Sequence, residues 1–246
     1  MQTYYLTDAG KVREHNEDSV IIIKNNSGEY LLAVADGMGG HQAGEIASSM
    51  TIDYLSNAFL ELDSIGDKAH AVEFLRTSVA AINQRIFAYT DEHAESKGMG
   101  TTLVLAILTN SYLLFGNIGD SSGFVLKDHK LYKVTKDHTL VNLLVSTGEL
   151  TEDEAKMHPK KNVLMRAIGA NDPIEIDVFD VDMGVEAIFL CSDGLTNMLS
   201  EEQITRVLET PNLTIEEKTI RLIKKSNNRG GNDNISVAYL AKESGE

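Results

Sequence analysis

Five aspartates lie at the ends of otherwise apolar stretches of the sequence. Three of them follow runs that we interpret as buried strands, and two stand just before such runs. They are Asp36, Asp120 and Asp193 in the first group and Asp18 and Asp233 in the second. A charge at the mouth of a core strand is costly unless something compensates it. Hard divalent cations with oxygen ligands are the natural compensation for converging carboxylates, so this pattern predicts a metal site built on strand ends.

A glycine-rich loop follows the first of these carboxylates, in the order Asp36-Gly-Met-Gly-Gly40. Such loops can also cradle phosphates. The dinucleotide fingerprint needs a third glycine where Gln42 stands, however, and a Walker loop needs a Gly-Lys-Ser/Thr that this segment lacks. We therefore interpret Gly37 as a residue that leaves its backbone carbonyl unobstructed for a second bond to a metal.

Other reactive side chains have simpler explanations. Cys191 lies inside an apolar run and is expected in the core, and Asn197 stands where a Cys-x5-Arg phosphatase loop needs arginine. His41 is expected at a helix start or on the surface rather than in catalysis. His15 and His138 are likewise expected to have no catalytic role.

Composition narrows the class of protein. The chain has 246 residues and a formal net charge of −15, which argues against nucleic acid or an anionic membrane as the main partner. No apolar run approaches the ~20 residues needed to cross a bilayer, and the first residues do not resemble a signal peptide. The single cysteine cannot form an internal disulfide. We expect a cytoplasmic protein without membrane insertion, and a monomer.

The elements that position the aspartates can be predicted from hydrophobic periodicity. Apolar residues recur at helical spacing over 43–58 and 72–89, which predicts a helix in each segment. Capping boxes predict further helix starts after Thr151, Ser200 and Thr214. Four strands are expected to form an antiparallel meander: Thr102–Leu108, Leu113–Ile118, Gly123–Leu126 and Leu131–Val134. Later strands are expected at Ile174–Val181, Val185–Leu190 and Ile235–Leu240.

Runs of strands with grouped helices indicate an α+β protein, with two antiparallel sheets packed face to face and helices outside. No linker or repeat interrupts the chain, so we expect a single domain over residues 1–246. The segment from Asp137 to Asn162 differs because it is polar, helix-prone and poor in large apolar groups. We expect it to be a surface insertion, a flap, near the site.

Six short motifs follow one another along the chain. They are Arg13 with Asn16-Glu-Asp18, Asp36-Gly-Met-Gly-Gly40, Gly100-Thr-Thr102, Gly119-Asp-Ser121, Ser192-Asp-Gly-Leu195 and Asp233-Asn234. In this order they resemble the protein phosphatase 2C family of metal-dependent serine/threonine phosphatases, most closely its compact bacterial members, over roughly Thr3 to Leu240. The resemblance implies a four-layer αββα sandwich with two or three Mg²⁺ or Mn²⁺ ions at one edge.

The resemblance also implies roles for the metal ligands. Asp36 would bridge two core ions and so take part in catalysis, and the carbonyl of Gly37 would bind the second ion. Asp193 and Asp233 would bind the first. Asp120, together with Asp193, would bind a third and weaker ion that is found in bacterial members.

Four further residues have implied roles around these ligands. Glu17 and Asp18 would hold metal-bound waters, Asp18 as part of the metal site and Glu17, like Asn234, as support for it. Arg13 would bind the substrate phosphate and act in catalysis. Phosphate binding by Arg13 also makes physical sense on its own, because a guanidinium fork matches phosphate oxygens.

Two positions depart from the family pattern. Relatives usually have arginine after Gly-Asp-Ser, where this chain has Ser122, so any support from that arginine is absent. Some relatives carry a histidine, proposed as general acid, where this chain has Met38. Another group or a metal-bound water must therefore protonate the leaving oxygen.

The implied function is hydrolysis of phosphoserine and phosphothreonine in proteins by a water that bridges two ions. A partner serine/threonine kinase would be one substrate. A binding module without catalysis would lack the bridging carboxylate, whereas Asp36 is present. A metal-dependent hydrolase of small phosphate compounds remains an open alternative.

Overall fold

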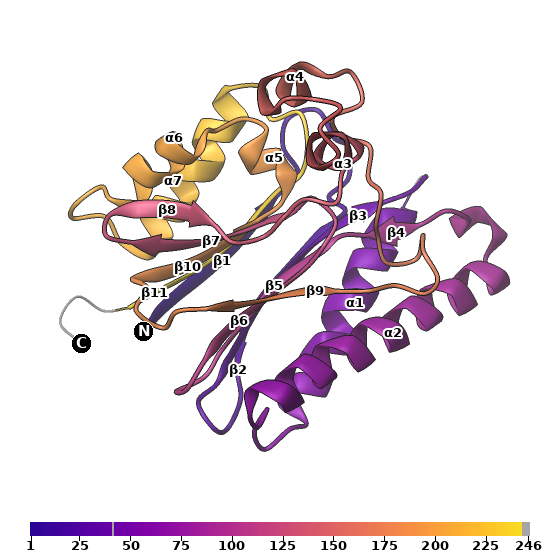
Figure 1. Ribbon diagram of the computed structural model, residues 1–246, viewed down its shortest axis with the longest axis horizontal. Coiled ribbons are helices and arrows are strands. Elements are labelled where there is room, and N and C mark those ends of the chain that lie inside the picture. The colour runs from indigo at the N-terminus through magenta and orange to yellow at the C-terminus, as the bar shows by residue number, and fades with distance from the viewer. Residues whose placement is uncertain (41, 243–246) are drawn as a thin grey trace.

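Two antiparallel sheets form the centre of the computed structural model, which describes residues 1–40 and 42–242 (Figure 1). His41, expected at a helix start, lies outside the described residues. The first sheet has the strand order β1 (Gln2–Asp8), β11 (Ile235–Ala241), β10 (Ala187–Cys191), β7 (Ser122–Lys127) and β8 (Lys130–Lys133). The second has the order β2 (Asp18–Lys24), β3 (Tyr30–Met38), β5 (Leu103–Leu108), β6 (Leu113–Ile118) and β9 (Asp177–Val181), and the short β4 (Gly100–Thr101) pairs with β3.

Helices cover the outer face of each sheet (Figure 1). The second sheet packs against α1 (Ala43–Leu60) and α2 (Lys68–Glu92), after which a short 3₁₀ turn spans Ala94–Ser96. The first sheet packs against α5 (Asp193–Thr196), α6 (Glu201–Leu208) and α7 (Ile215–Asn228). A separate apolar cluster fills the space between the two sheets. The predicted four-layer αββα sandwich is confirmed.

Strand β3 shows how the sequence pattern produces these layers. Leu31, Ala33 and Ala35 belong to the cluster under α1 and α2, whereas Leu32 and Val34 belong to the cluster between the sheets. Alternate side chains of a strand point to opposite faces, so an all-apolar run must be buried on both faces. The strand can then present a carboxylate only where it leaves the core.

The predicted meander is wrong at its centre. β5 pairs with β6, and β7 pairs with β8, but β6 and β7 belong to different sheets. The chain crosses between the sheets at Gly119, whose φ of +98° suits glycine, and a Cβ there would lie 2.6 Å from Cγ2 of Thr102. The crossing therefore carries Asp120 to the edge of the sandwich.

Other predicted elements can be compared directly with the structure. The three capping boxes are confirmed: Thr151 with Glu154, Ser200 with Gln203 and Thr214 with Glu217. The strand expected from Ile174 begins later, at Asp177. Strand β1 was not predicted, and it pairs along its whole length with β11 from the other end of the chain.

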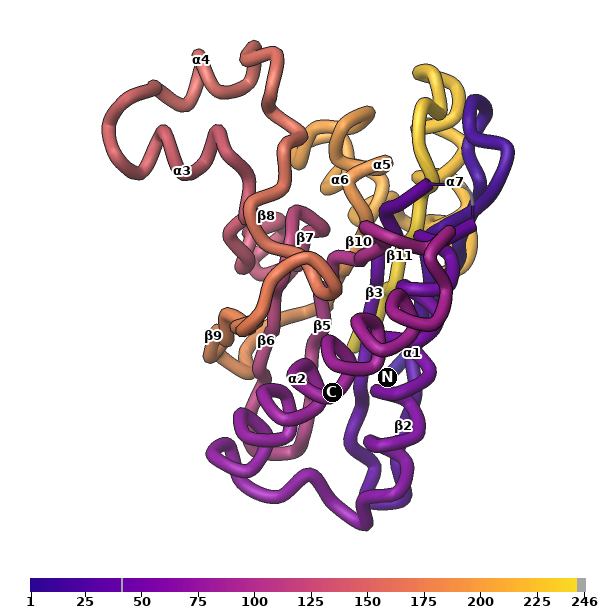
Figure 2. Tube along the Cα trace, turned by 90° about the vertical axis from the view of Figure 1, so that its right-hand side faces the viewer, coloured from indigo at the N-terminus to yellow at the C-terminus, as the bar shows by residue number. Residues whose placement is uncertain are grey.

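Helices α3 (Leu140–Ser146) and α4 (Glu152–Met157) stand apart from the sandwich (Figures 1 and 2). We refer to residues 137–166 as the helical lobe. Val141 and Ala155 are the buried residues of its two helices. Its ends are joined by a hydrogen bond of 2.9 Å from the Leu140 N–H to the Val163 carbonyl and by a β-bridge between Thr139 and Leu164. The lobe is thus anchored mainly at its base.

Within the described part of the chain, the helices include none with the length and apolar character required to span a membrane.

Candidate metal centre

The five aspartates come together at one edge of the sandwich. Asp18 opens β2 and lies opposite Asp36 on β3 in the antiparallel register. Asp193 follows β10 at the first position of α5, and Asp233 lies two residues before β11. Four of the five, all except Asp18, line a pocket of about 260 Å³ together with Arg13, Glu17 and the Gly37 loop. Residues from distant parts of the sequence therefore share one small polar pocket.

The backbone around Gly37 is packed too tightly for a side chain. A Cβ at Gly37 would lie 2.1 Å from the Gly44 carbonyl oxygen, and a Cβ at Gly44 would lie 2.8 Å from the carboxyl carbon of Glu17. The N–H of Gly37 donates to the Glu17 carbonyl at 3.1 Å. Glycine is thus required here for close approach between β3, α1 and the Glu17 segment. The metal contact of the Gly37 carbonyl stays a prediction.

Two threonines fix the backbone of Asp36. The hydroxyl of Thr101 donates to the Asp36 carbonyl at 2.9 Å, and the N–H of Thr102 donates to the same oxygen at 2.9 Å. The Asp36 N–H donates to the Thr102 hydroxyl at 3.0 Å, and that hydroxyl bonds to buried Ser121 at 2.8 Å. The sequence motif contained both threonines, but their role as backbone clamps was missed because the pairing of β4 with β3 was not predicted.

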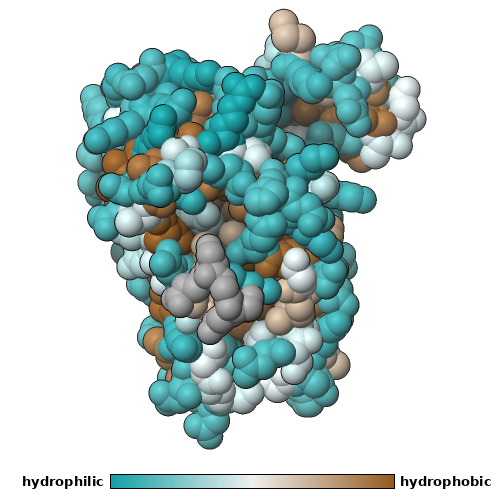
Figure 3. Space-filling model, turned by 90° about the vertical axis from the view of Figure 1, so that its left-hand side faces the viewer, coloured by the Kyte–Doolittle hydropathy of each residue, from teal (hydrophilic) through white to brown (hydrophobic). Residues whose placement is uncertain are grey.

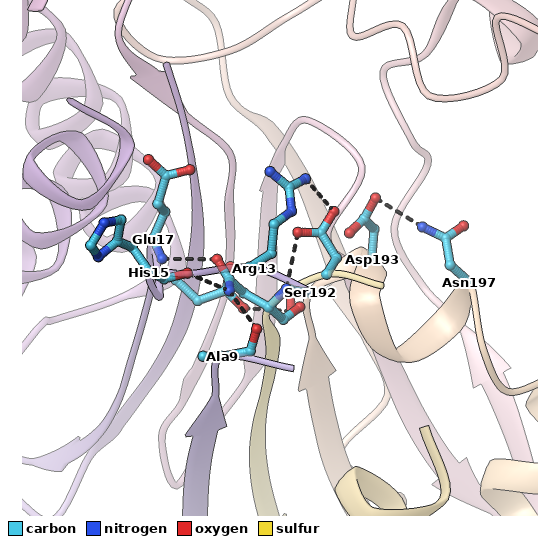
Figure 4. Close-up of polar contacts among 10 residues, drawn as sticks. Ala9, Arg13, His15, Glu17, Ser192, Asp193 and Asn197 are labelled. Carbon is cyan, nitrogen blue, oxygen red and sulfur yellow. Dashed lines mark hydrogen bonds and ion pairs between the residues drawn. The ribbon is translucent and has the colours of Figure 1, made fainter. Parts of the chain in front are cut away.

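Asn234 ties three separate backbone groups together. Its side-chain oxygen accepts the Glu17 N–H at 2.8 Å, and its amide nitrogen donates to the carbonyls of Ala9 and His15 at 3.0 and 2.9 Å. This places the loop that carries Arg13 against the loop that carries Asp233 (Figure 4). His15 contributes to this clamp through its backbone.

Several carboxylate oxygens at the centre are buried without a hydrogen-bond partner among the described residues. They are Oε1 of Glu17, Oδ1 of Asp18 and Oδ1 of Asp193. The other oxygen of Asp18 accepts from the Ser192 hydroxyl at 2.7 Å. That of Asp193 accepts from the Asn197 amide at 3.0 Å (Figure 4). Buried polar atoms normally have partners, so these oxygens point to a ligand.

The pKa values of the aspartates agree with a need for positive charge. Burial, reinforced by the neighbouring carboxylates, raises the pKa of Asp36 well above its usual value. The same two causes raise the pKa of Asp18 to about 7, that of Asp120 to about 7 and that of Asp193 to about 6. Divalent cations that prefer oxygen would bond the unpartnered oxygens and offset this repulsion. The donor set therefore fits Mn²⁺ or Mg²⁺.

Arg13 supplies a cation to the lining of this pocket. Its Nη2 donates to Oδ2 of Asp233 at 2.9 Å, and its side chain is 50% exposed. The guanidinium lies between the carboxylates of Glu17 and Asp193 in the view of Figure 4. A guanidinium has five N–H donors, so Arg13 can hold Asp233 and still offer donors to an anion in the pocket.

A second group of possible ligands lies elsewhere. His129, Glu186 and Glu209 place one ligand atom each within 4.8 Å of one another. His129 lies in the turn between β7 and β8, and Glu186 precedes β10, whereas Asp193 follows the other end of β10. The ring of His129 already bonds Glu209 at 2.5 Å. This exposed group is therefore separate from the aspartate centre.

Comparisons with known proteins agree with this geometry. A family model described as protein phosphatase 2C matches residues 9–227. The serine/threonine phosphatase stp of Listeria monocytogenes is 39% identical over 244 residues, which cover 99% of this chain and 96% of that protein. The structure of the S. agalactiae serine/threonine phosphatase has a TM-score of 0.91 and 37% identity, covering 98% of this chain and 99% of that one. The catalytic domain of the phosphatase PstP, in complex with two manganese ions, has a TM-score of 0.82 and 35% identity, covering 97% of this chain and 96% of its own. The chain therefore belongs to the protein phosphatase 2C family of protein serine/threonine phosphatases.

Proposed function

We propose that this chain hydrolyses phosphoserine and phosphothreonine in proteins with Mn²⁺ or Mg²⁺ as cofactor. The observation that carries the proposal is the convergence of five aspartates at one edge of the sandwich, with unpartnered buried oxygens. Four of them line one pocket together with the exposed Arg13. The names of the relatives support protein substrates, and the two manganese ions bound to PstP support the choice of metal.

In this proposal Asp36, Asp193 and Asp233 hold two core ions with the Gly37 carbonyl, and Asp120 contributes to a third site. Asp18 belongs to the same ligand group, with Glu17 and Asn234 in supporting positions. Ions bound there would supply positive charge and would lower the pKa of a water molecule, which is the chemistry that phosphate ester hydrolysis requires.

The residues of the chain would position and neutralise the phosphate. The free N–H donors of Arg13 can bind its oxygens, while Nη2 of the same side chain donates to Asp233. Met38 lines the pocket but carries no proton to give to the leaving oxygen. Ser122 is buried at the start of β7, so an arginine at that position would need a different local packing. We infer that a metal-bound water or a group other than residue 38 protonates the leaving oxygen.

The test of the proposed function compares substrate classes on one protein preparation. With Mn²⁺ present, a set of phosphoserine and phosphothreonine peptides is expected to give higher kcat/KM than nucleotides and sugar phosphates. The reverse order would favour the alternative of a small-phosphate hydrolase. No turnover of any phosphate ester, by a protein that melts cooperatively, would favour a binding module without catalysis.

Replacement of Arg13 by alanine is expected to lower kcat/KM for phosphopeptides by about 10- to 100-fold, because a hydrogen bond to a charged group contributes about 1.5–3 kcal/mol. The variant Arg13→Lys keeps the positive charge but lacks the planar fork of N–H donors. Its kcat/KM should therefore fall less than that of Arg13→Ala. Mn²⁺ affinity, measured by calorimetry, should change little in both. An unchanged kcat/KM in Arg13→Ala would exclude Arg13 as the phosphate ligand.

We propose that the chain forms a single catalytic domain over residues 1–246. We also propose that the helical lobe, whose main part is the flap at 137–162, selects protein substrates. A cleft of about 1100 Å³ lies between the lobe and the centre, and Asp120 and Asp193 line it on one side. The lobe contributes apolar and basic groups to this cleft, including Leu143, Val145 and Lys161. Figure 3 shows hydrophobic side chains among hydrophilic ones on the projecting lobe. Such a surface suits a peptide flanking the phosphorylated residue.

Substitution of Leu143 and Lys161 by alanine is therefore expected to lower kcat/KM for phosphoproteins by roughly tenfold. Turnover of p-nitrophenyl phosphate should be nearly unchanged, because this ester is too small to reach the lobe. Met157→Ala is the matched control, since Met157 lies on α4, is 86% exposed and is outside the cleft lining. Equal losses on both substrates would show that the lobe acts only in folding.

Amide exchange in α3 and α4 is expected to be faster than in β3 or β10.

We further propose that a serine/threonine kinase of the same cell is one of the substrates, as the family resemblance implies. A monomer remains the expected state. A pull-down with phosphorylated kinase domains, followed by mass spectrometry of the remaining phosphosites, would test the first of these proposals.

A further inference from the structure

His138 holds both backbone polar groups of Gly119, the residue directly before Asp120. The His138 N–H donates to the Gly119 carbonyl at 2.8 Å, and the Gly119 N–H donates to Nδ1 of His138 at 3.1 Å. The buried side chain of Asn117 adds a weaker contact, from Nδ2 to the Gly119 carbonyl at 3.2 Å. The turn that carries Asp120 is thus fixed chiefly by one histidine.

These contacts determine the state of the imidazole. Because Nδ1 accepts a hydrogen bond, the ring proton resides on Nε2, which donates to Oδ2 of Asp177 at 3.1 Å. The side chain is 10% exposed, and burial lowers the pKa of His138. The ring is therefore neutral near pH 7 and acts as both acceptor and donor. It does not touch the pocket that holds Arg13 and Asp36.

The same histidine connects Asp120 to the base of the helical lobe. Asp177 accepts a second hydrogen bond, from Nη1 of Arg166 at 2.5 Å. Met165, next to Arg166, donates its N–H to the His138 carbonyl at 2.8 Å. His138, Arg166 and Asp177 all line the cleft between the lobe and the centre. A continuous set of contacts therefore runs from the lobe to the turn of Asp120.

Asp120 needs such support. Asp193 and Asp137 repel its carboxylate, and the preceding Gly119 has a φ of +98°, in a region of backbone space where glycine is unusually free. A repelled carboxylate on a pliable turn would move away from its neighbours. A ligand held in place binds an ion with less reorganisation, and the groups that orient metal ligands contribute to metal affinity for this reason.

We propose that His138 is a positioning residue for ion binding at Asp120, acting through its Nδ1 contact with Gly119 and linking that turn to the base of the lobe. The inference rests on the proposed function, since it needs Asp120 to be a ligand. It adds a residue that neither composition nor motif order singled out, because its partners lie 19 and 39 positions away.

The experiment measures Mn²⁺ binding by calorimetry on the full chain and on the variants His138→Ala, His138→Asn and His138→Gln. The side-chain oxygen of asparagine can take the position of Nδ1 and accept from Gly119, whereas the amide nitrogen of glutamine reaches towards Asp177 instead. His138→Ala and His138→Gln are expected to weaken one class of Mn²⁺ sites by about tenfold or more, and His138→Asn by less than about threefold. His158→Ala, at another histidine of the lobe, is the control and should match the wild type.

A second measurement separates a positioning role of His138 from a general loss of folding stability. Turnover of p-nitrophenyl phosphate by His138→Ala should return to the wild-type kcat as Mn²⁺ is raised, with an unchanged KM for the ester. A wild-type isotherm for His138→Ala, or equal weakening of all Mn²⁺ sites with a lowered Tm, would overturn the inference. If the alanine variant does not fold, the asparagine and glutamine variants decide, and equal affinities of these two would overturn it. Wild-type protein that binds no Mn²⁺ would instead refute the proposed function.

Discussion

Removal of divalent cations is expected to abolish phosphopeptide turnover, lowering kcat by a factor of about 10³ or more, because several kcal/mol of transition-state stabilisation depend on them. The proposed ligands are all oxygen atoms at the edge of the sandwich, and sites of this kind exchange their ions reversibly. The measurement is kcat after exhaustive treatment with chelator and dialysis, followed by readdition of Mn²⁺ or Mg²⁺. Readdition should restore activity.

Dialysis without chelator is the control, and it should leave some activity. Full turnover after exhaustive chelation, with metal content checked by elemental analysis, would refute the metal requirement. Loss of activity that readdition does not restore, in a protein that still melts cooperatively, would also count against reversible oxygen ligation.

A thermal melt gives a second readout of the same prediction through its pH dependence. The folded-state pKa values of Asp18 and Asp120 are about 7 and that of Asp193 is about 6, all above the ordinary value of 3.8. Between about pH 4 and 7 the metal-free folded state therefore binds more protons than the unfolded state, so its free energy of unfolding falls as pH rises. Mn²⁺ bound by the proposed ligands would displace these protons and offset the repulsion. The rise in Tm on adding Mn²⁺ should thus be larger at pH 8 than at pH 5.

The layers of the fold could be predicted because hydrophobic periodicity is a local property. In β3 and in α1 the apolar spacing alone indicates which faces are buried. Strand β1 could not be found in this way, since its exposed and half-buried residues alternate weakly and its partner β11 lies more than 200 residues away. The break between β6 and β7 was missed because strand spacing and turn residues do not specify which sheet the next strand joins.

The candidate site likewise combines features that sequence patterns predict with features that they do not. The aspartates stand out because a charge at the end of an apolar run is unusual, and the structure brings these residues together. The pairing of Arg13 with Asp233 and the clamp of His138 on Gly119 depend on contacts between distant segments. No spacing rule predicts such contacts. Gly37 illustrates a further limit, because the structure supplies a packing reason for glycine that its neighbours in sequence do not reveal.

The largest single-residue effect is expected for Asp36→Asn, which should lower kcat/KM by about 10³-fold or more, since a neutral amide is a much weaker ligand for divalent cations than a carboxylate. The fold should persist, because the bonds from Thr101 and Thr102 to residue 36 involve its backbone. Asp193→Ala and Asp233→Ala are expected to lose catalysis in the same way. Asp53→Asn, at an exposed position of α1, is the matched control and should turn over normally.

Asp36→Asn should also make the metal-free protein more stable. Asp36 is repelled by Asp18, Asp193, Asp120 and Asp233, and burial and this repulsion raise its pKa in the folded state. The destabilisation that it causes is absent below the unfolded-state pKa and fully present above the folded-state pKa. The Tm of the metal-free variant should therefore exceed that of the wild type by about 5 °C at pH 8, and by much less at pH 4. Normal turnover by a folded Asp36→Asn protein would exclude Asp36 as the bridging ligand. A lower Tm at pH 8 would show that a contact made by the carboxylate outweighs the repulsion it experiences.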